Sequence, residues 1–142
     1  MKKNPGRTYL MARLPIAVSA LGHGIDRIPK IQVFSDHLVS QFSKSILPIK
    51  LVSLFSMTLP FIELGVGILL ILGLFTRFAC VVGLITMLAL IFGSCLLEQW
   101  DNVLSQMLYG LYFVMLYYYA FYNRYSFDRL LGRIPNAKTH VL

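Results

Sequence analysis

Long apolar runs separated by short polar connections make up most of the chain. Four such runs lie at about 9–28, 49–75, 78–97 and 103–122. A helix needs about 20 mainly apolar residues to cross the hydrocarbon core of a bilayer, and each run reaches or approaches that length. The strict alternation of apolar and polar positions that marks a barrel strand does not occur in them. The pattern predicts an all-α integral membrane four-helix bundle.

The segment between the first two runs, 29–47, is too polar to cross a bilayer but has helical periodicity. Ile31, Phe34 and Ile46 are among the apolar positions that recur at helical spacing, while Ser35 is among the polar positions that fall between them. Such a pattern is typical of a helix with one apolar face. We expect an amphipathic helix that lies along the outer membrane surface or folds over the mouth of the bundle.

Composition and charge support this class of protein. The sequence is 57% hydrophobic and only 13% charged, with a formal net charge of +7. The charges lie mostly at the ends and in the connections of the apolar runs, so lipid phosphates rather than nucleic acid are the expected counter-charge. Four crossings place both termini on one side, and because most of the 13 Lys and Arg fall there, that side is cytoplasmic. We expect one domain over 1–133 and a flexible cytoplasmic tail over 134–142.

Glu63 is the clearest candidate for chemistry, because it stands near the middle of the second run. An unpaired charge at that depth costs about 2.5 to 3.5 kcal/mol on insertion scales. Polar residues of the first run fall within an arc of about 140°, which should face the interior of the bundle. These residues are Arg13, Ser19, His23, Asp26 and Arg27. His23 and Glu63 lie at similar depth at about 1.5 Å per residue, so we expect them to pair, directly or through water, with Arg13 and Arg27 serving the two ends of the arc.

This pair of residues has more than one interpretation. A glutamate and a histidine can hold or pass a proton, which fits a ligand or proton site. They can equally tie two helices together or contact another subunit. At the cytoplasmic turn, Arg77 is expected to anchor lipid headgroups or the carbonyl end of the second helix.

Tyrosines are frequent in the fourth run. Their hydroxyls need partners at depth, so some should line the interior or contact another subunit. The candidates are Tyr109, Tyr112, Tyr118 and Tyr119.

Several cofactor chemistries lack the residues they require. Cys80 and Cys95 are separated by about 22 Å if their run is one helix, which is too far for a disulfide, and no Cys-x-x-Cys pair is present. His37 and His140 fall outside the four runs, so no metal or haem site is expected. There is no phosphate-binding glycine loop and no nucleophile elbow. An accessory subunit without a covalently bound cofactor is therefore favoured over a self-sufficient enzyme.

Three segments carry a family resemblance. They are Leu-Gly-His-Gly-Ile-Asp-Arg ending at Arg27, Leu-Pro-Phe-Ile-Glu-Leu-Gly-Val-Gly-Ile-Leu-Leu-Ile-Leu-Gly-Leu-Phe-Thr-Arg ending at Arg77, and Tyr-Ser-Phe-Asp-Arg-Leu-Leu-Gly-Arg ending at Arg133. Over roughly 13–133 the chain resembles the DoxX family of small four-helix membrane proteins. In that family a lysine commonly follows the His-Gly segment, and Arg27 stands in its place here.

The resemblance implies a multi-pass protein of the bacterial inner membrane, related to the membrane subunit of thiosulfate:quinone oxidoreductase. It implies a non-catalytic or quinone-interacting subunit of a membrane oxidoreductase system. The alternatives are a structural or scaffolding subunit of a larger membrane complex and a small transporter or proton-path component. The expected partners are the lipid bilayer and either other membrane proteins or further copies of the chain.

Overall fold

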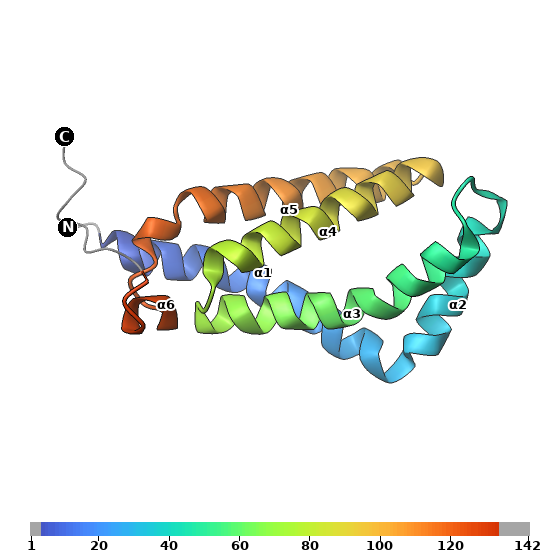
Figure 1. Cartoon of the computed structure of the whole chain (residues 1–142). Helices are drawn as coiled ribbons and strands as arrows, with labels where there is room; N and C mark the ends of the chain where they lie inside the picture. Colours follow the sequence, from blue (N-terminus) through green and yellow to red (C-terminus); the bar gives the residue numbers. More distant parts are fainter. Residues whose placement is uncertain (1–3, 134–142) are drawn as a thin grey trace.

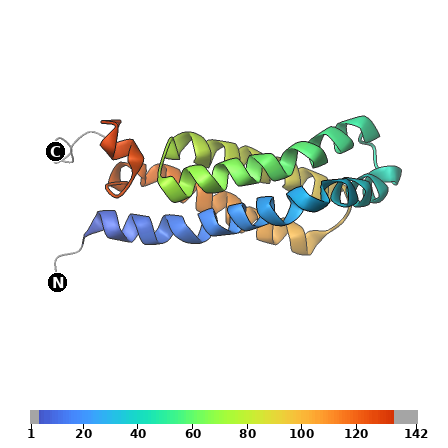
Figure 2. The same ribbon diagram turned by 90° about the horizontal axis from the view of Figure 1, so that it is seen from below.

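The computed structural model of the chain describes residues 4–133, and the predicted tail 134–142 lies outside them. All regular elements in the described part are helical, which confirms the all-α prediction. The long helices are α1 (Pro5–Arg27), α3 (Ile49–Leu72), α4 (Thr76–Leu96) and α5 (Trp100–Tyr118). The shorter helices are α2 (Ile31–Gln41) and α6 (Phe127–Leu130), with 3-10 turns η1 (Ile28–Lys30), η2 (Phe42–Lys44) and η3 (Ala120–Tyr122). The start of α1 and the whole of α6 lie at one end of the molecule, and α2 lies at the other (Figures 1 and 2).

The helix ends differ from those predicted because local backbone geometry overrides the apolar pattern. α3 ends at Leu72, three residues early, because Gly73 adopts a left-handed conformation with φ of 65°. Phe75 is also left-handed, with φ of 47°, so the chain reverses while the sequence is still apolar. α1 begins four residues early, at Pro5, which suits the first turn of a helix. α3 and α4 are each long and apolar enough to cross a membrane.

The long helices pack as two pairs. α1 packs chiefly on α3, and α4 chiefly on α5, whereas α3 and α4 touch less. Small residues allow the close crossing in the first pair, because a Cβ at Gly24 would meet the backbone of Leu64 and a Cβ at Gly67 would meet that of Leu21. The two pairs separate toward the α2 end of the molecule (Figure 1).

α2 packs against α3 at the wider end of the molecule. The hydroxyl oxygens of Ser35 on α2 and Ser56 on α3 lie 2.7 Å apart, and both residues are buried. Ser35, expected on the polar face, is therefore an inward residue. Ile46, expected on the apolar face, is 84% exposed, because the helical periodicity ends at η2 before reaching it. These two details of the amphipathic prediction were wrong.

Candidate functional site

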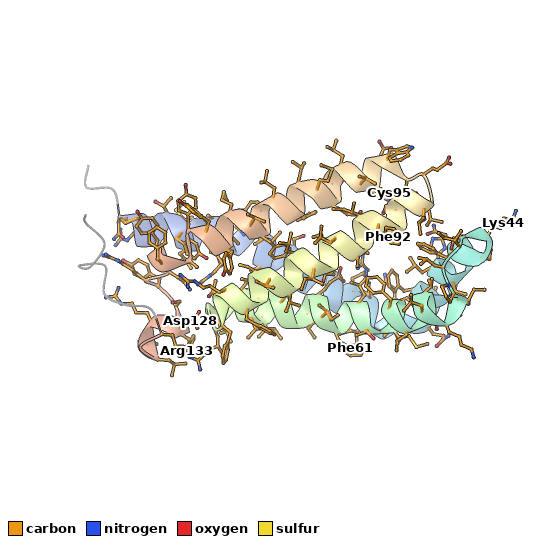
Figure 3. The ribbon with its side chains drawn as sticks, turned by 45° about the horizontal axis from the view of Figure 1, so that its top comes forward. Lys44, Phe61, Phe92, Cys95, Asp128 and Arg133 are labelled. Atoms are coloured by element: carbon orange, nitrogen blue, oxygen red, sulfur yellow. The ribbon has the colours of Figure 1, made fainter. Side chains whose placement is uncertain are left out.

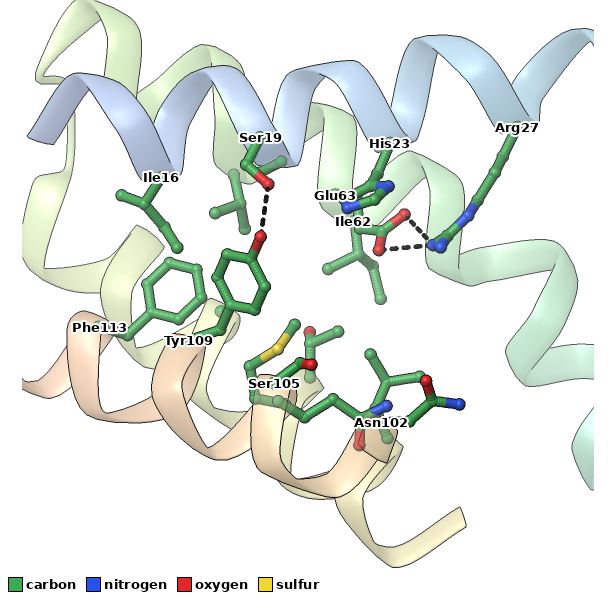
Figure 4. A pocket seen from close by; sticks show the side chains of 17 residues that line it. Ile16, Ser19, His23, Arg27, Ile62, Glu63, Asn102, Ser105, Tyr109 and Phe113 are labelled. Atoms are coloured by element: carbon green, nitrogen blue, oxygen red, sulfur yellow. Dashed lines mark hydrogen bonds and ion pairs between the residues drawn. The ribbon is translucent and has the colours of Figure 1, made fainter. Parts of the chain in front are cut away.

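A cavity of about 270 Å³ lies between the two helix pairs and is lined by α1, α3, α4 and α5 (Figure 4). Apolar side chains such as Ile16, Val66 and Phe113 form part of its wall. The polar part of the lining consists of Ser19, His23, Arg27, Glu63, Thr86, Asn102, Ser105, Gln106 and Tyr109. A mainly apolar wall with a few polar groups is the usual character of a small-molecule site.

An ion pair between α1 and α3 forms one wall of this cavity. Nη1 of Arg27 donates to both carboxylate oxygens of Glu63, at 2.7 Å to Oε1 and 2.6 Å to Oε2. Glu63 is 7% exposed, so its charge depends on this partner. The guanidinium carbon of Arg27 also lies 4.8 Å from the ring centroid of Phe34 on α2. Arg27 therefore joins three helices at one point.

His23 lies beside this pair, as Figure 4 shows, and lines the same cavity. Within residues 4–133 the side chain that hydrogen-bonds Glu63 is Arg27 rather than His23. The expectation of a direct Glu63–His23 hydrogen bond is thus corrected. Arg27 lies one helical turn beyond His23 on the same face, and its guanidinium is the group that donates to the carboxylate.

Two other charged candidates lie away from the cavity. Asp26 is exposed and pairs with Lys30 at 2.8 Å, one turn along the chain. Arg77 is exposed, with its guanidinium carbon 6.0 Å from the ring centroid of Tyr117. Neither residue lines the cavity between the helix pairs.

The tyrosine candidates divide into inward and outward residues. Tyr109 lines the cavity, and its hydroxyl lies 3.3 Å from that of Ser19. Tyr112 donates to the backbone carbonyl of Ala12 and so ties α5 to α1. Tyr118 and Tyr119 are exposed and pack edge to face on each other, with centroids 5.0 Å apart.

Arg13 is buried, but it lies at the α6 end of the molecule rather than in the cavity. It donates to the side-chain oxygen of Asn123 and, at 3.2 Å, to the carbonyl of Tyr125. Asn123 in turn donates from its amide nitrogen to the hydroxyl of Thr76 at 2.8 Å. Arg13 thus holds α1 to the chain that follows α5, and Asn123 joins that chain to the start of α4.

The carboxylate of Asp128 completes this junction. It accepts hydrogen bonds from the backbone N–H groups of Phe75 and Thr76, at 2.7 and 2.8 Å. Asp128 and Arg133 lie at the end of the molecule opposite Lys44 (Figure 3). The segments 73–77 and 125–129, both part of the resemblance to a known family, therefore meet at this structural junction and not in the cavity.

Tyr125 lies at the outer edge of this junction. Hydrogen bonds from Arg7 and then Asn4 to its hydroxyl lower the pKa of Tyr125 below its usual value. Asn4 donates from its amide nitrogen at 3.3 Å. The start of α1 is thereby tied to the segment that precedes α6.

Most of the cavity residues of α5 were not predicted as site residues. Asn102, Gln106, Tyr109 and Phe113 are spaced by four, three and four positions, so they share one helical face that lines the cavity. Among them only Tyr109 was a candidate. The signal that could have found the others is this row of polar residues at helical spacing in an otherwise apolar run.

Two of the helices are long and apolar enough to cross a membrane, and a charged pair joins α1 to α3. The DoxX family model matches residues 8–94, which is more than half of the chain, and the chain belongs to the DoxX family. The match includes His23, Arg27 and Glu63, while α5 and α6 lie beyond it. Comparison with curated proteins gave no match, and neither did comparison with solved structures.

Proposed function

We propose that this DoxX protein binds a small hydrophobic molecule with a polar head, such as a quinone, in the cavity beside Glu63. In this proposal it is a multi-pass protein of the bacterial inner membrane, with both termini in the cytoplasm. It acts as a quinone-interacting subunit of a membrane oxidoreductase system rather than as a complete enzyme.

The outward faces of the helices support four crossings. α3 and α4 pass the test of length and composition. α1 presents Met11 and Val18 outward, at 72% and 60% exposure, and α5 presents Leu104 and Leu111, at 63% and 66%. An apolar surface that extends over all four long helices is unfavourable in water and is matched by lipid.

The Arg27–Glu63 pair in the wall of the cavity is the observation that carries the proposal. A charged pair that only fastened two helices would be expected to lie packed between them, whereas this one borders open space between the helix pairs. The guanidinium supplies donors, the carboxylate supplies acceptors, and the neighbouring imidazole of His23 can hold or release a proton. These are the groups that a carbonyl- or hydroxyl-bearing ring requires.

The test is quinone binding to the purified full chain in lipid nanodiscs, measured by equilibrium dialysis with a decyl-substituted benzoquinone. Glu63→Gln removes the charge and releases Arg27, and we expect affinity to fall about tenfold or more, since hydrogen bonds involving a charged group contribute about 1.5 to 3 kcal/mol. Asp26→Asn is the matched control, because Asp26 precedes Arg27, is exposed and does not line the cavity. Unchanged binding by Glu63→Gln would refute the proposal.

A structural subunit is the second candidate, and the position of Arg27 favours it. The same guanidinium contacts Glu63 on α3 and Phe34 on α2, as interhelical glue would. Under this hypothesis Glu63→Ala lowers thermal stability, and no quinone copurifies with the wild-type protein. The exposed Tyr118 and Tyr119 would then be the surface that another chain covers.

A further inference from the structure

A second cavity, of about 530 Å³, lies beneath α2 at the wider end of the molecule. Aromatic rings from three helices and the turn η2 give it a mainly apolar wall, formed in part by Phe34, Phe42, Phe55 and Phe92. Arg27 is the charged residue in its described lining. The lining also includes uncharged polar side chains, but the mainly apolar wall suits a hydrocarbon chain.

The two cavities adjoin, because four residues line both of them. These shared residues are Arg27, Leu90, Asn102 and Gln106. Arg27 lies at this boundary with its guanidinium turned to Glu63, on the side of the smaller cavity. A single elongated molecule could thus occupy the smaller polar cavity and the larger apolar one at once.

Gln106 provides a hydrogen-bond acceptor at the boundary between the two cavities. Its side-chain nitrogen donates to the hydroxyl of Ser94 at 3.0 Å. Its side-chain oxygen is shielded from solvent and accepts no hydrogen bond from residues 4–133. Buried polar atoms normally have a partner, so this oxygen favours a ligand group that donates, such as a hydroxyl.

We propose that the two cavities form one site for an amphiphile with a hydroxyl-bearing ring and a long apolar chain. The ring lies between Gln106 and the Arg27–Glu63 pair, and the chain runs into the cavity beneath α2. This inference rests on the proposed function and narrows its ligand to a chain-bearing phenol or quinol. A quinol hydroxyl donates to the Gln106 oxygen, whereas a quinone carbonyl cannot.

Gly93 offers a way to block the outer cavity alone. It lines only that cavity, and a Cβ there would lie 3.1 Å from the ring of Phe42, which lines the same cavity. Gly93→Leu therefore adds a side chain to the wall of this cavity and pushes on the Phe42 ring, which together reduce the space assigned to the chain. Gly22→Leu is the matched control, because Gly22 is also helical, lines neither cavity and has nothing within 4 Å of its Cβ position.

The experiment compares two quinols on the full chain in nanodiscs under argon: 2,3-dimethoxy-5-methylbenzoquinol and the same ring with a decyl chain. We expect Gly93→Leu to weaken binding of the decyl compound about tenfold and to leave the chainless ring within about twofold, because only the chain meets the new side chain. Gly22→Leu should leave both unchanged. Gln106→Leu should weaken both quinols and leave the corresponding quinones unaffected.

The outcomes separate this inference from the proposed function. If the decyl compound binds Gly93→Leu as well as wild type, or if Gly93→Leu weakens both compounds equally, the chain assignment is overturned while the ring site stands. If Gln106→Leu weakens quinol and quinone alike, the hydroxyl assignment is overturned. Absence of binding by wild type overturns both proposals. Ala89→Leu, at another position that lines only the outer cavity, repeats the test should Gly93→Leu fail to fold.

Discussion

The side chain of Asp128 is predicted to stabilise the turn between α3 and α4, and Asp128→Ala tests this directly. Its two carboxylate oxygens accept from the backbone amides of Phe75 and Thr76, at the start of α4. A helix cannot satisfy these first amides by its own hydrogen bonds. The backbone N–H of Asp128 also donates to the carbonyl of Gly73 at 3.0 Å, so α6 and the turn are held in both directions.

The expected loss of stability depends on how deeply each of the two amide hydrogen bonds is buried. The hydrogen bond to Thr76 is buried and the one to Phe75 is partly buried, so water replaces the carboxylate more readily at Phe75 than at Thr76. One buried hydrogen bond to a charged group is worth about 1.5 to 3 kcal/mol. The negative charge at a helix N-terminus adds about 0.3 to 1 kcal/mol. We therefore expect Asp128→Ala to lower the free energy of unfolding by about 2 to 4 kcal/mol.

Unfolding by sodium dodecyl sulfate in mixed micelles, followed by circular dichroism, measures this loss. Asp101→Ala is the control, because Asp101 is exposed in the first turn of α5 and its carboxylate forms no hydrogen bond within the described chain. Only the helix-terminus effect is lost there, so the decrease should stay below about 1 kcal/mol. If the two substitutions cost the same, or if Asp128→Ala costs less than about 0.5 kcal/mol, the capping role assigned from the geometry is wrong.

The same unfolding assay tests the helix crossing and the ion pair. Gly67→Leu places a side chain against the backbone of Leu21 and should lower the free energy of unfolding by about 3 kcal/mol or prevent folding. Gly65→Leu, with nothing within 4 Å of its Cβ position, should lower it by less than about 0.5 kcal/mol. Equal losses for the two variants would contradict the close crossing of α1 and α3. Arg27→Met leaves the carboxylate of Glu63 without its partner and should cost about 3 kcal/mol, most of which the double variant with Glu63→Gln should recover. Strict additivity of the two changes would argue against direct pairing.

The helices could be predicted from the sequence, but the turn between α3 and α4 could not. A run of twenty or more apolar residues indicates a membrane-crossing helix of about that length. The reversal after Leu72 depends on left-handed backbone at Gly73 and Phe75, which tertiary contacts with Asp128 support. Because the segment Gly-Leu-Phe at 73–75 is itself apolar, the hydrophobic pattern gives no sign that the helix has ended.

The positions of the candidate residues around the axis of α1 were predictable from the sequence, but the contacts of their side chains were not. Spacing along α1 places Arg13, His23 and Arg27 on one side of the helix. It does not say which of these side chains hydrogen-bonds Glu63. Arg13 and His23 are ten positions apart, about 15 Å along the axis, so a shared face did not imply a shared site. One hydrogen-bond partner of Arg13, Asn123, lies 110 positions away in the chain and gives no local signal.

The glycines at the crossing of α1 and α3 help to judge whether the Arg27–Glu63 ion pair is needed to hold these helices together. α1 and α3 already approach closely at Gly24 and Gly67, where neither backbone leaves room for a Cβ. Such contacts hold helices together without any charge. A buried ion pair adds little net stability because desolvation offsets its attraction. Because close packing already joins α1 and α3, the proposed ligand site predicts that Glu63→Gln loses more in binding than in stability, whereas a structural role of the pair predicts the reverse.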